Sequence, residues 1–377
     1  MKKDLRVVVI SDVHLGNERN TTEFILSNLY VFFREQFKRN DLDGIFIGGD
    51  LFDTQLSYNS PDGQDIAIFI SWFLEQCALK NILVRVLKGT PSHDWDQNSW
   101  LETIAKVQKL PIRLRYVKDL SLEYISEWDF NILYMPDEWT NDTDITHKQV
   151  LQLLKENNLS QVDFILMHGQ FDFQIPPELV KIPRHISENY KPLAKYFVSV
   201  GHIHTPQFFD NIIGQGSFDR MAHGEEEAKG GVEFCMNKDG SKSYAFIENK
   251  GSRIFKTIDI KHKDVEKTYK YLEKQFLHIP NGSFIRLRLS KDHPVVSSFD
   301  QLKLKYPLYR WSKIIEGQQE SSPNSTFIET QLIPYKATSI TRENITGLVK
   351  DRLSNLGYMT ADVAALINVF NDVISSI

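Results

Sequence analysis

The sequence predicts an α/β protein: a layered sheet sandwich flanked by helices, followed by a smaller α+β domain and a helical C-terminal tail. Two observations lead to this prediction. Short apolar runs alternate with amphipathic stretches through residues 1–228, which is typical of sheets that helices cover on both faces. Beyond residue 228, turn-forming residues separate shorter strand-like segments, and the chain ends in a helical pattern.

The first domain is expected to span residues 1–228. Thr21 or Thr22 can cap a helix that carries Phe24 and Ile25, and residues 65–79 present a second apolar helical face. Continuous apolar runs between these helices indicate buried strands. The expected strands are residues 5–10, 44–48, 82–87, 131–135, 162–167 and 196–200.

The second domain, residues 229–316, is expected to be a compact α+β unit. Gly230-Gly231 and the run at 237–240 are typical of turns. The expected elements are strands at 243–247, 253–258, 283–289 and 309–315 and a helix at 264–276. A polar stretch with a proline then predicts a linker over residues 317–340.

The tail, residues 341–377, is expected to form two helices, which Thr341 and Thr360 can cap. The second helix carries an apolar stripe with helical spacing, made of Val363, Leu366, Ile367, Phe370, Val373, Ile374 and Ile377. Such a stripe can pack back on the parent domain. Its position after a polar linker favours docking on a partner instead.

Composition excludes several classes of protein. The 377 residues suit two domains, and a net charge of −5 excludes a strongly basic nucleic-acid wrapper, although local basic patches stay open. Cys77 and Cys235 are the two cysteines, too few for a disulfide scaffold or a cysteine-rich zinc module. The apolar run at 7–10 is too short for a secretory signal, and no stretch suits a membrane helix. We therefore expect a soluble cytoplasmic protein.

Acidic and histidine residues follow five of the expected strands. They are Asp12 and His14, then Asp50, then His93 with Asp94, then His168, and finally His202 with His204. Ligands of open α/β sheets bind beyond the carboxyl ends of the strands, so parallel strands would bring these side chains to the same edge of one sheet. One such residue alone is more often a turn or surface group, but five of the 11 histidines lie at these ends. Their coincidence predicts a metal site.

The number of candidate ligands indicates two metals. One catalytic zinc needs three protein ligands and a water. Six of the side chains at these strand ends are standard ligands of a divalent metal: Asp12, His14, Asp50, His168, His202 and His204. Two cations that share a carboxylate fit this set better. Mixed imidazole and carboxylate ligands suit manganese, iron or zinc, and such a pair can assist phosphoryl displacement.

The ordered motifs resemble those of the calcineurin-like metallophosphoesterase superfamily. They run Asp12-Val13-His14, Gly49-Asp50, Ser92-His93-Asp94, His168-Gly169 and Gly201-His202-Ile203-His204. Within that superfamily the chain is most similar to the SbcD-type nuclease subunits of DNA double-strand-break repair complexes. The opening at 11–16, the segment at 214–220 with its acidic continuation at 223–225, and the order of the domains carry the narrower resemblance.

The resemblance implies a role for each residue of the site. The site would hold two divalent metal ions, with Mn²⁺ the expected species. The metal ligands would be Asp12, His14 and His204 for the first ion and His168 and His202 for the second, and Asp50 would bind both. His93 would be the catalytic acid or transition-state stabiliser, a role that suits an imidazole near neutral pH. Asp94 would orient His93.

One departure concerns the second metal. The family has an asparagine ligand where this chain has Ser92, and the preceding glycine stands further back, at Gly89. Ser92 is expected to be a weaker metal ligand, unless a water fills the position or the loop is rebuilt. Gln215 stands where the family has a proline, so both positions indicate a divergent branch.

The resemblance also implies an activity and partners. The activity is 3′-to-5′ exonuclease on duplex DNA and endonuclease on single strands or hairpins, coupled to an SbcC-type coiled-coil ATPase that binds the C-terminal helices. A homodimer would form through residues 21–33 or the next helix. Candidate phosphate contacts are Arg19, Lys88, Arg220, Lys250, Arg253, Lys256, Lys261 and Lys263.

Two alternatives remain open at this point. The same chemistry serves phosphatases and nucleotide phosphodiesterases, against which the additional domain and tail argue. In the second alternative, a weak second metal leaves mainly a scaffold that recruits an ATPase to DNA.

Overall fold

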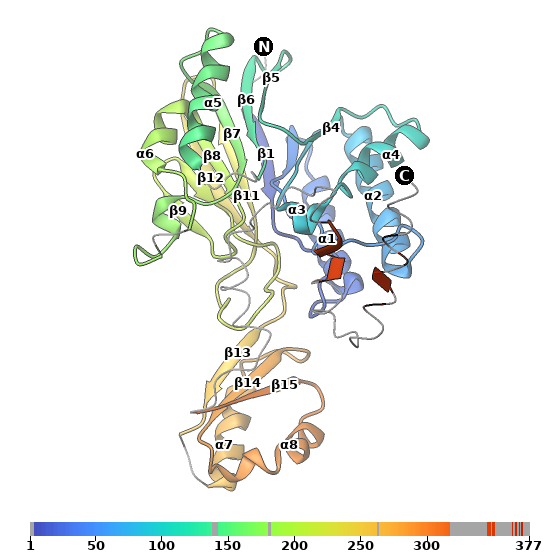
Figure 1. The fold of residues 1–377 in the computed structure, drawn as a ribbon, viewed down its shortest axis with the longest axis vertical. Coiled ribbons are helices and arrows are strands. Elements are labelled where there is room, and N and C mark those ends of the chain that lie inside the picture. Colours follow the sequence, from blue (N-terminus) through green and yellow to red (C-terminus); the bar gives the residue numbers. More distant parts are fainter. Residues whose placement is uncertain are drawn as a thin grey trace. The chain divides into compact units, whose positions relative to one another are not determined.

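The computed structural model describes residues 4–137, 142–179, 182–261 and 264–316, together with isolated positions between 345 and 371. Its larger part contains two six-stranded sheets that pack face to face, with helices on both outer faces (Figure 1). This confirms the predicted α/β sheet sandwich.

Six strands form the first sheet: β1 (Leu5–Ile10), β2 (Gly44–Ile47), β3 (Leu83–Leu87), β4 (Leu114–Val117), β11 (Gly230–Met236) and β12 (Lys242–Glu248). Their order is β12-β11-β1-β2-β3-β4. β1 to β4 run parallel, and β11 pairs antiparallel with β1. All residues of β2 and β3 are buried, as expected for parallel strands covered on both faces.

The second sheet contains β5 (Ser121–Ile125), β6 (Phe130–Met135), β7 (Val162–His168), β8 (Ala194–Gly201), β9 (Gln207–Phe209) and β10 (Ile212–Gly214). Their order is β5-β6-β7-β8-β10-β9, in which β6, β7, β8 and β10 are parallel. The edge strands β5 and β9 pair antiparallel. Both sheets therefore carry parallel strands at their centres.

Helices cover the outer faces, and side chains cap several of them. Thr21 caps α1, Ser60 caps α2 and Asp142 caps α5 by accepting hydrogen bonds from backbone N–H groups of the first turn. The helices are α1 (Thr22–Phe37), α2 (Pro61–Leu79), α3 (Pro91–Asp94), α4 (Ser99–Val107), α5 (Thr143–Glu156) and α6 (Ser187–Tyr190), with 3₁₀ turns η1 (Asp172–Gln174) and η2 (Lys191–Leu193).

The strands divide the apolar residues among three layers. In β1, Val7 and Val9 belong to the core between the two sheets, whereas Val8 and Ile10 pack with α1 and α2. Alternate residues of a strand point to opposite faces, which explains this division. On the far side, Val150 of α5 packs against the second sheet. The sandwich thus has the order helices, sheet, sheet, helices.

A smaller parallel sheet follows. It contains β13 (Phe255–Asp259), β14 (Phe284–Leu289) and β15 (Arg310–Ile315), connected by α7 (Val265–Phe276), η3 (Pro294–Val296) and α8 (Phe299–Lys305). Asp264 caps α7. Leu272, Leu287 and Leu302 lie in its own apolar core. The predicted helix and strands of this part are present, and the parallel order makes the sheet a βαβ-type unit.

The structure differs from the expectation around residue 229. The residues predicted as a turn, Gly230-Gly231, begin β11, and both β11 and β12 belong to the first sheet. A Cβ at Gly230 would lie 2.0 Å from the Ile247 oxygen, and one at Gly231 would lie 2.7 Å from the Val9 oxygen. The glycines therefore allow close strand pairing instead of a turn. The predicted domain boundary at 229 lies inside the sandwich.

Most of the predicted tail lies outside the described residues, including the linker at 317–340 and Phe370. Helical positions are described at 345–347, 349–350, 364, 366–367, 369 and 371. The Thr346 hydroxyl donates to the Asn371 amide oxygen at 2.8 Å, which joins the two predicted helical segments. Among the residues that the structure describes, none of the helices has the length and apolar character to span a lipid bilayer.

Candidate metal centre

The predicted site residues meet where strands of both sheets end. Asp12 and His14 follow β1, Asp50 follows β2, and His93 follows β3. From the second sheet, His168 ends β7, and His202 and His204 follow β8. The expectation of one sheet edge is therefore corrected to two facing sheets, because β7 and β8 pair with each other and not with β1 to β3.

The backbone at these strand ends is unusual. Four candidate ligands have positive φ angles: Asp12 (51°), His14 (57°), Asp50 (49°) and His202 (98°). Non-glycine residues rarely adopt this region, and such strain is concentrated at functional sites. Backbone hydrogen bonds hold the conformation, since Asp12 N donates to the Gly49 oxygen at 3.0 Å and His14 N to the Asp50 oxygen at 3.1 Å.

Two glycines leave room for the ligands. Gly49 has a φ of +96°, and a Cβ there would lie 2.3 Å from His168 Nδ1. A Cβ at Gly89 would lie 2.1 Å from the backbone nitrogen of Asp50. Any side chain at either position would displace a candidate ligand.

Asp12, His14 and His204 form the first group of candidate ligands. The Nε2 atoms of the two histidines lie 3.1 Å apart. Their Nδ1 atoms face carboxylates, Asp53 at 2.9 Å from His14 and Glu225 at 3.2 Å from His204. Each Nδ1 therefore donates a proton outward, and both Nε2 lone pairs point toward one place.

Asp50, His168 and His202 form a second group. His168 Nδ1 donates to the Gly48 oxygen at 2.7 Å, so its Nε2 lone pair faces Asp50 Oδ2 at 3.3 Å. Asp50 also belongs to a third group with His14 and His93. The carboxylate of Asp50 therefore lies close both to His168 and His202 and to His14 of the first group, as a bridging ligand would.

Charge is concentrated in this buried site. Burial alone would lower the pKa of His14 and His168, but the neighbouring carboxylates Asp53 and Asp50 raise them to about 9 and about 10. Burial would raise the pKa of Asp50, but His168 and the other histidines hold it well below its usual range. Burial and the adjacent His168 lower the pKa of His202 to about 4. The buried carboxylates need positive charge beside them, which protonated imidazoles or bound metal cations can supply.

Residues 5–206, more than half of the chain, match the calcineurin-like phosphoesterase family. The chain belongs to this family. Two solved structures are also similar, at low identity. TT1561 of Thermus thermophilus is 10% identical with a TM-score of 0.36, covering 64% of this chain and 98% of that one. GAP50, the anchor in the inner membrane complex of Plasmodium, is 11% identical with a TM-score of 0.40, covering 66% and 86%.

As a calcineurin-like phosphoesterase, the chain is a metal-dependent hydrolase, and its donor set fits divalent cations. The facing Nε2 lone pairs of His14 and His204 repel each other unless a proton or a metal lies between them. With metal–ligand bonds of about 2.1 Å, neighbouring ligand atoms lie about 3.0–3.4 Å apart. The separations of 3.1 Å and 3.3 Å in the two groups have this size.

His93 lies beside the ligands in this phosphoesterase. Its Nδ1 is 2.8 Å from the Asp53 carbonyl oxygen, and its ring contacts the His14 ring edge-on at 5.0 Å. The side chain is 26% exposed, whereas His14 and Asp50 are almost fully buried. His93 therefore combines contact with the ligands and access to solvent, and His202 is also partly exposed.

Asp94 was expected to orient His93, but the structure gives it a different role. Its carboxylate accepts hydrogen bonds from the backbone nitrogens of Asp50, Phe52 and Gly89, and from the Asn98 amide. Burial and the charge of Asp50 raise its pKa to about 6. Asp94 thus fixes the loops after β2 and β3, while the Asp53 carbonyl holds His93.

The structure does not bring Ser92 into the ligand groups. Ser92 is exposed on α3, and the hydroxyl beside the second group is that of Thr90. Its oxygen lies 3.2 Å from Asp50 Oδ2, 3.4 Å from His202 Nδ1 and 3.5 Å from His168 Nε2. The loop is therefore rebuilt, which was one of the three possibilities for this position.

Three supporting residues were not assigned from the sequence. Asp53 holds His14 and His93, and Glu225 holds His204. Fully buried Lys229 lies 3.1 Å from Glu225 and donates to the His204 oxygen at 2.7 Å. Burial would raise the pKa of Glu225, but His204 and Lys229 lower it to about 2. Asp53 stands three residues after the Gly49-Asp50 motif and Glu225 lies in the segment at 223–225, whereas Lys229 lies in neither.

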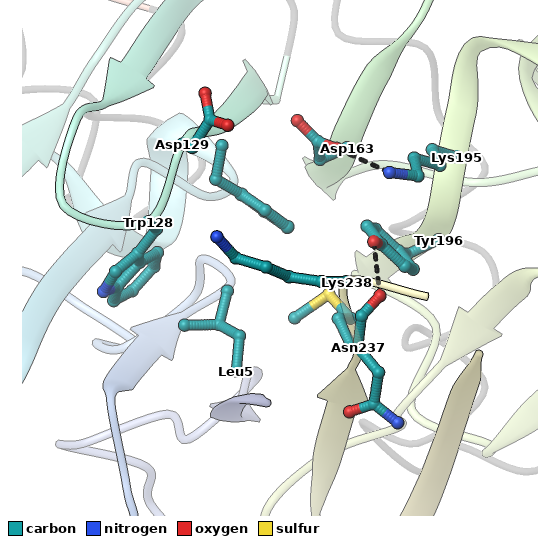
Figure 2. Close-up of a pocket in the computed structure, with 10 residues that line it drawn as sticks. Leu5, Trp128, Asp129, Asp163, Lys195, Tyr196, Asn237 and Lys238 are labelled. Carbon is teal, nitrogen blue, oxygen red and sulfur yellow. Dashed lines mark hydrogen bonds and ion pairs between the residues drawn. The ribbon is translucent and has the colours of Figure 1, made fainter. Parts of the chain in front are cut away.

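A polar pocket of about 180 Å³ lies at the opposite ends of the strands (Figure 2). Leu5, Phe130 and Tyr196 line it near the starts of β1, β6 and β8. The Tyr196 hydroxyl donates to the Asn237 oxygen at 2.7 Å, and Lys195 pairs with Asp163 at 3.9 Å. This pocket contains none of the candidate ligands.

Proposed function

We propose that this phosphoesterase is a two-metal DNA phosphodiesterase, with 3′-to-5′ exonuclease activity and endonuclease activity on single strands and hairpins. It would act in the cytoplasm with an SbcC-type ATPase in DNA end processing. The choice of DNA rests on Arg19, Arg220, Arg253 and Arg286, which lie on or around the loop at residues 219–229, although the loop itself holds more acidic than basic residues. Glu225 of this loop contacts His204.

The chain's own residues support hydrolysis of a phosphodiester. Asp12, His14 and His204 would hold one divalent cation and His168 and His202 the other, with Asp50 between them. When bound, such cations activate water and stabilise the charge on phosphoryl oxygens.

His93 supplies the proton chemistry. Its Nδ1–H donates to the Asp53 oxygen, which orients the ring and leaves Nε2 for the substrate. Protonated at Nε2, His93 can donate to the leaving oxygen as general acid.

Arginines surround the 219–229 loop. The Arg19 guanidinium donates to the Met221 oxygen at 3.0 Å, and Arg220 donates to the Ser252 oxygen at 3.3 Å. The Arg253 guanidinium lies over the Phe24 ring at 3.8 Å. Arg220 Nε and an Arg253 terminal nitrogen are buried without a hydrogen-bond partner. Both side chains are half-buried and not fully covered, and guanidinium groups suit phosphate oxygens.

His223 lies near two of these arginines, although burial is the main cause of its pKa shift. Burial, together with Arg286 and Arg19, lowers its pKa to about 3, so it is neutral at physiological pH. Its Nδ1 is buried without a hydrogen-bond partner, and its ring packs on Phe255 of β13 at 5.4 Å. Arg19 and Arg286 therefore act on this part of the loop, although the loop also carries Glu225, Glu226 and Glu227 and the whole chain has a charge of −5. Arginines in this position would attract a polyanion such as DNA.

The test compares DNA with a small ester. Wild-type protein with Mn²⁺ is expected to degrade linear duplex DNA from 3′ ends and to cut single-stranded circles and hairpins faster than it hydrolyses a phenyl phosphodiester. Asp50→Asn removes the charge that both metal positions share, and cleavage of every substrate should fall more than about tenfold. Rapid hydrolysis of the small ester with no DNA cleavage would instead identify a phosphatase-like enzyme.

The partner proposal rests on the tail. The helical positions described in the tail, which the hydrogen bond between Thr346 and Asn371 joins, would contact the coiled coil of the ATPase together with the apolar stripe expected from the sequence. A homodimer through α1 and α2 is part of the same proposal. Exposed apolar side chains on these two helices, Val31 and Ile68, are each more than 60% accessible, which leaves a surface for such contact.

A further inference from the structure

Thr90 lies where three candidate ligands converge. Its Oγ1 is within 3.5 Å of Asp50 Oδ2, His168 Nε2 and His202 Nδ1. A hydroxyl has one proton and donates to one acceptor at a time. The oxygen also has two lone pairs, which can accept hydrogen bonds from the histidines or bind a cation.

The spacing matches that of a fourth ligand. Atoms at the corners of a tetrahedral site with bonds of about 2.1 Å lie about 3.4 Å apart. Among the four atoms of Thr90, Asp50, His168 and His202, the four separations described are 3.2, 3.3, 3.4 and 3.5 Å. The ligand atoms of Asp50, His168 and His202 lie within 4.8 Å of one another, so one cation could lie among all four atoms.

The local structure also turns this hydroxyl inward. Thr90 occupies the N-cap of α3, where threonine usually accepts a hydrogen bond from the first turn. Its side chain makes no such cap bond. Instead, its backbone N–H donates to Asp50 Oδ1 at 2.6 Å, which leaves the hydroxyl beside Asp50 Oδ2.

We propose that the Thr90 hydroxyl is an oxygen ligand of the cation held by Asp50, His168 and His202. A neutral hydroxyl attracts a cation less than a carboxylate does, so this position should bind metal more weakly than the position of Asp12, His14 and His204. The chain would then load its two metals at different concentrations. This inference rests on the two-metal centre of the proposed function but not on DNA as substrate.

Calorimetric titration of Mn²⁺ into metal-free full-length protein tests the proposal. Wild type should bind two ions with dissociation constants at least tenfold apart. Thr90→Val keeps the shape of the side chain but removes the oxygen, and it should lower the affinity for only the more weakly bound ion, by at least tenfold. Thr90→Ser keeps the oxygen and should restore it.

The other outcomes separate distinct failures. Two unchanged Mn²⁺ ions in Thr90→Val would overturn the role of Thr90 while leaving the two-metal centre intact. Weaker binding of both ions in Thr90→Val, or no recovery of affinity in Thr90→Ser, would mean that Thr90 only positions Asp50, which is expected to bind both ions. A single ion in wild type would overturn the two-metal centre itself. Circular dichroism and melting in chelator check folding, and Thr90→Ala replaces Thr90→Val if the valine variant is unfolded.

Discussion

His93 is held by its neighbours in a way that suits proton transfer. Its Nδ1 is occupied by the Asp53 carbonyl, and its ring lies against His14 at the exposed side of the centre. The same Asp53 contacts His14 through its carboxylate. One residue therefore orients both a candidate ligand and the candidate acid.

Replacing His93 should affect the rate more than the metals. We expect His93→Ala to lower Mn²⁺-dependent DNA cleavage about 100-fold or more, the usual contribution of a general acid, with the bound metal count unchanged. Calorimetry and cleavage assays together check this, with His147→Ala on α5 as a control. Loss of a metal ion in His93→Ala would show that His93 is a ligand, as its place in the His14 and Asp50 group also allows.

Asp219 is a buried acid that belongs to none of the candidate ligand groups. Its carboxylate accepts hydrogen bonds from the side-chain amides of Asn28 and Asn249. Burial raises its pKa to about 7, although the hydrogen bonds of Asn28 and Ser252 and the charges of Arg220 and Arg253 act in the opposite direction. The folded protein therefore holds a proton there more tightly than the unfolded chain.

The pKa of Asp219 predicts a pH dependence of stability. Because the folded pKa of about 7 exceeds the ordinary value of 3.8, the contribution to stability is complete below about pH 4 and is lost as the pH rises to about 7. Asp219→Asn cannot titrate, so its melting temperature should fall less than that of wild type between pH 5 and pH 8. Thermal melts in chelator measure this, and parallel pH profiles for the two proteins would contradict it.

At the level of single residues, the sequence predicted the Asp and His residues that the structure brings together but not their supports. Strand ends are visible in a sequence as apolar runs followed by Asp or His, and this placed Asp12, Asp50 and His168. Thr90 and Ser92 are two residues apart, and the start of α3 decides which of them faces the metal centre. The sequence pattern does not show at which residue this helix begins. The role of Glu225 could not be predicted, because it depends on a contact with His204, which is 21 residues away in the sequence.

The arginines around the 219–229 loop should decide DNA affinity. Arg286 of β14 contributes to the positive field at His223. Arg286→Gln should weaken duplex DNA binding severalfold and reduce the slope of log Kd against log salt by about 1, the value for one phosphate contact. Hydrolysis of a phenyl phosphodiester should not change.

Arg113→Gln provides the matched control, since Arg113 pairs with Glu127 beside β4. Binding and salt titrations of both variants measure the difference. An unchanged salt slope in Arg286→Gln would remove this arginine from the proposed DNA surface.

The tail is expected to act separately from catalysis. Deleting residues after Ser339 should leave Mn²⁺-dependent cleavage of short DNA largely intact, because every candidate ligand lies between residues 12 and 204. The same deletion should abolish association with an SbcC-type ATPase and any stimulation by ATP. Pull-down and cleavage assays test both parts. A truncated protein that melts much earlier and loses basal activity would show that the apolar stripe packs on its own chain.

Among the elements, long apolar runs were predicted well and pairings were not. Residues 5–10 form β1 as expected, since every residue of that run is apolar or β-branched except Arg6. The partner of β1 was missed, because β11 follows it by more than 200 residues and begins with two glycines that normally indicate a turn. Sequence periodicity reports burial of a strand but not which strand lies beside it.

For the whole molecule, the position of Glu225 and Lys229 sets an order in time. The chain is synthesised from its N-terminus, so Asp12 and Asp50 leave the ribosome long before the residues that brace His204. A nascent chain that ends after β8 and His204 contains all the Asp and His side chains of the three candidate groups but lacks the Glu225 contact and the Lys229 hydrogen bond. The hydrolytic centre would therefore be completed only with the loop that also carries Arg220, so the capacity to cut would mature together with part of the surface that we propose binds DNA.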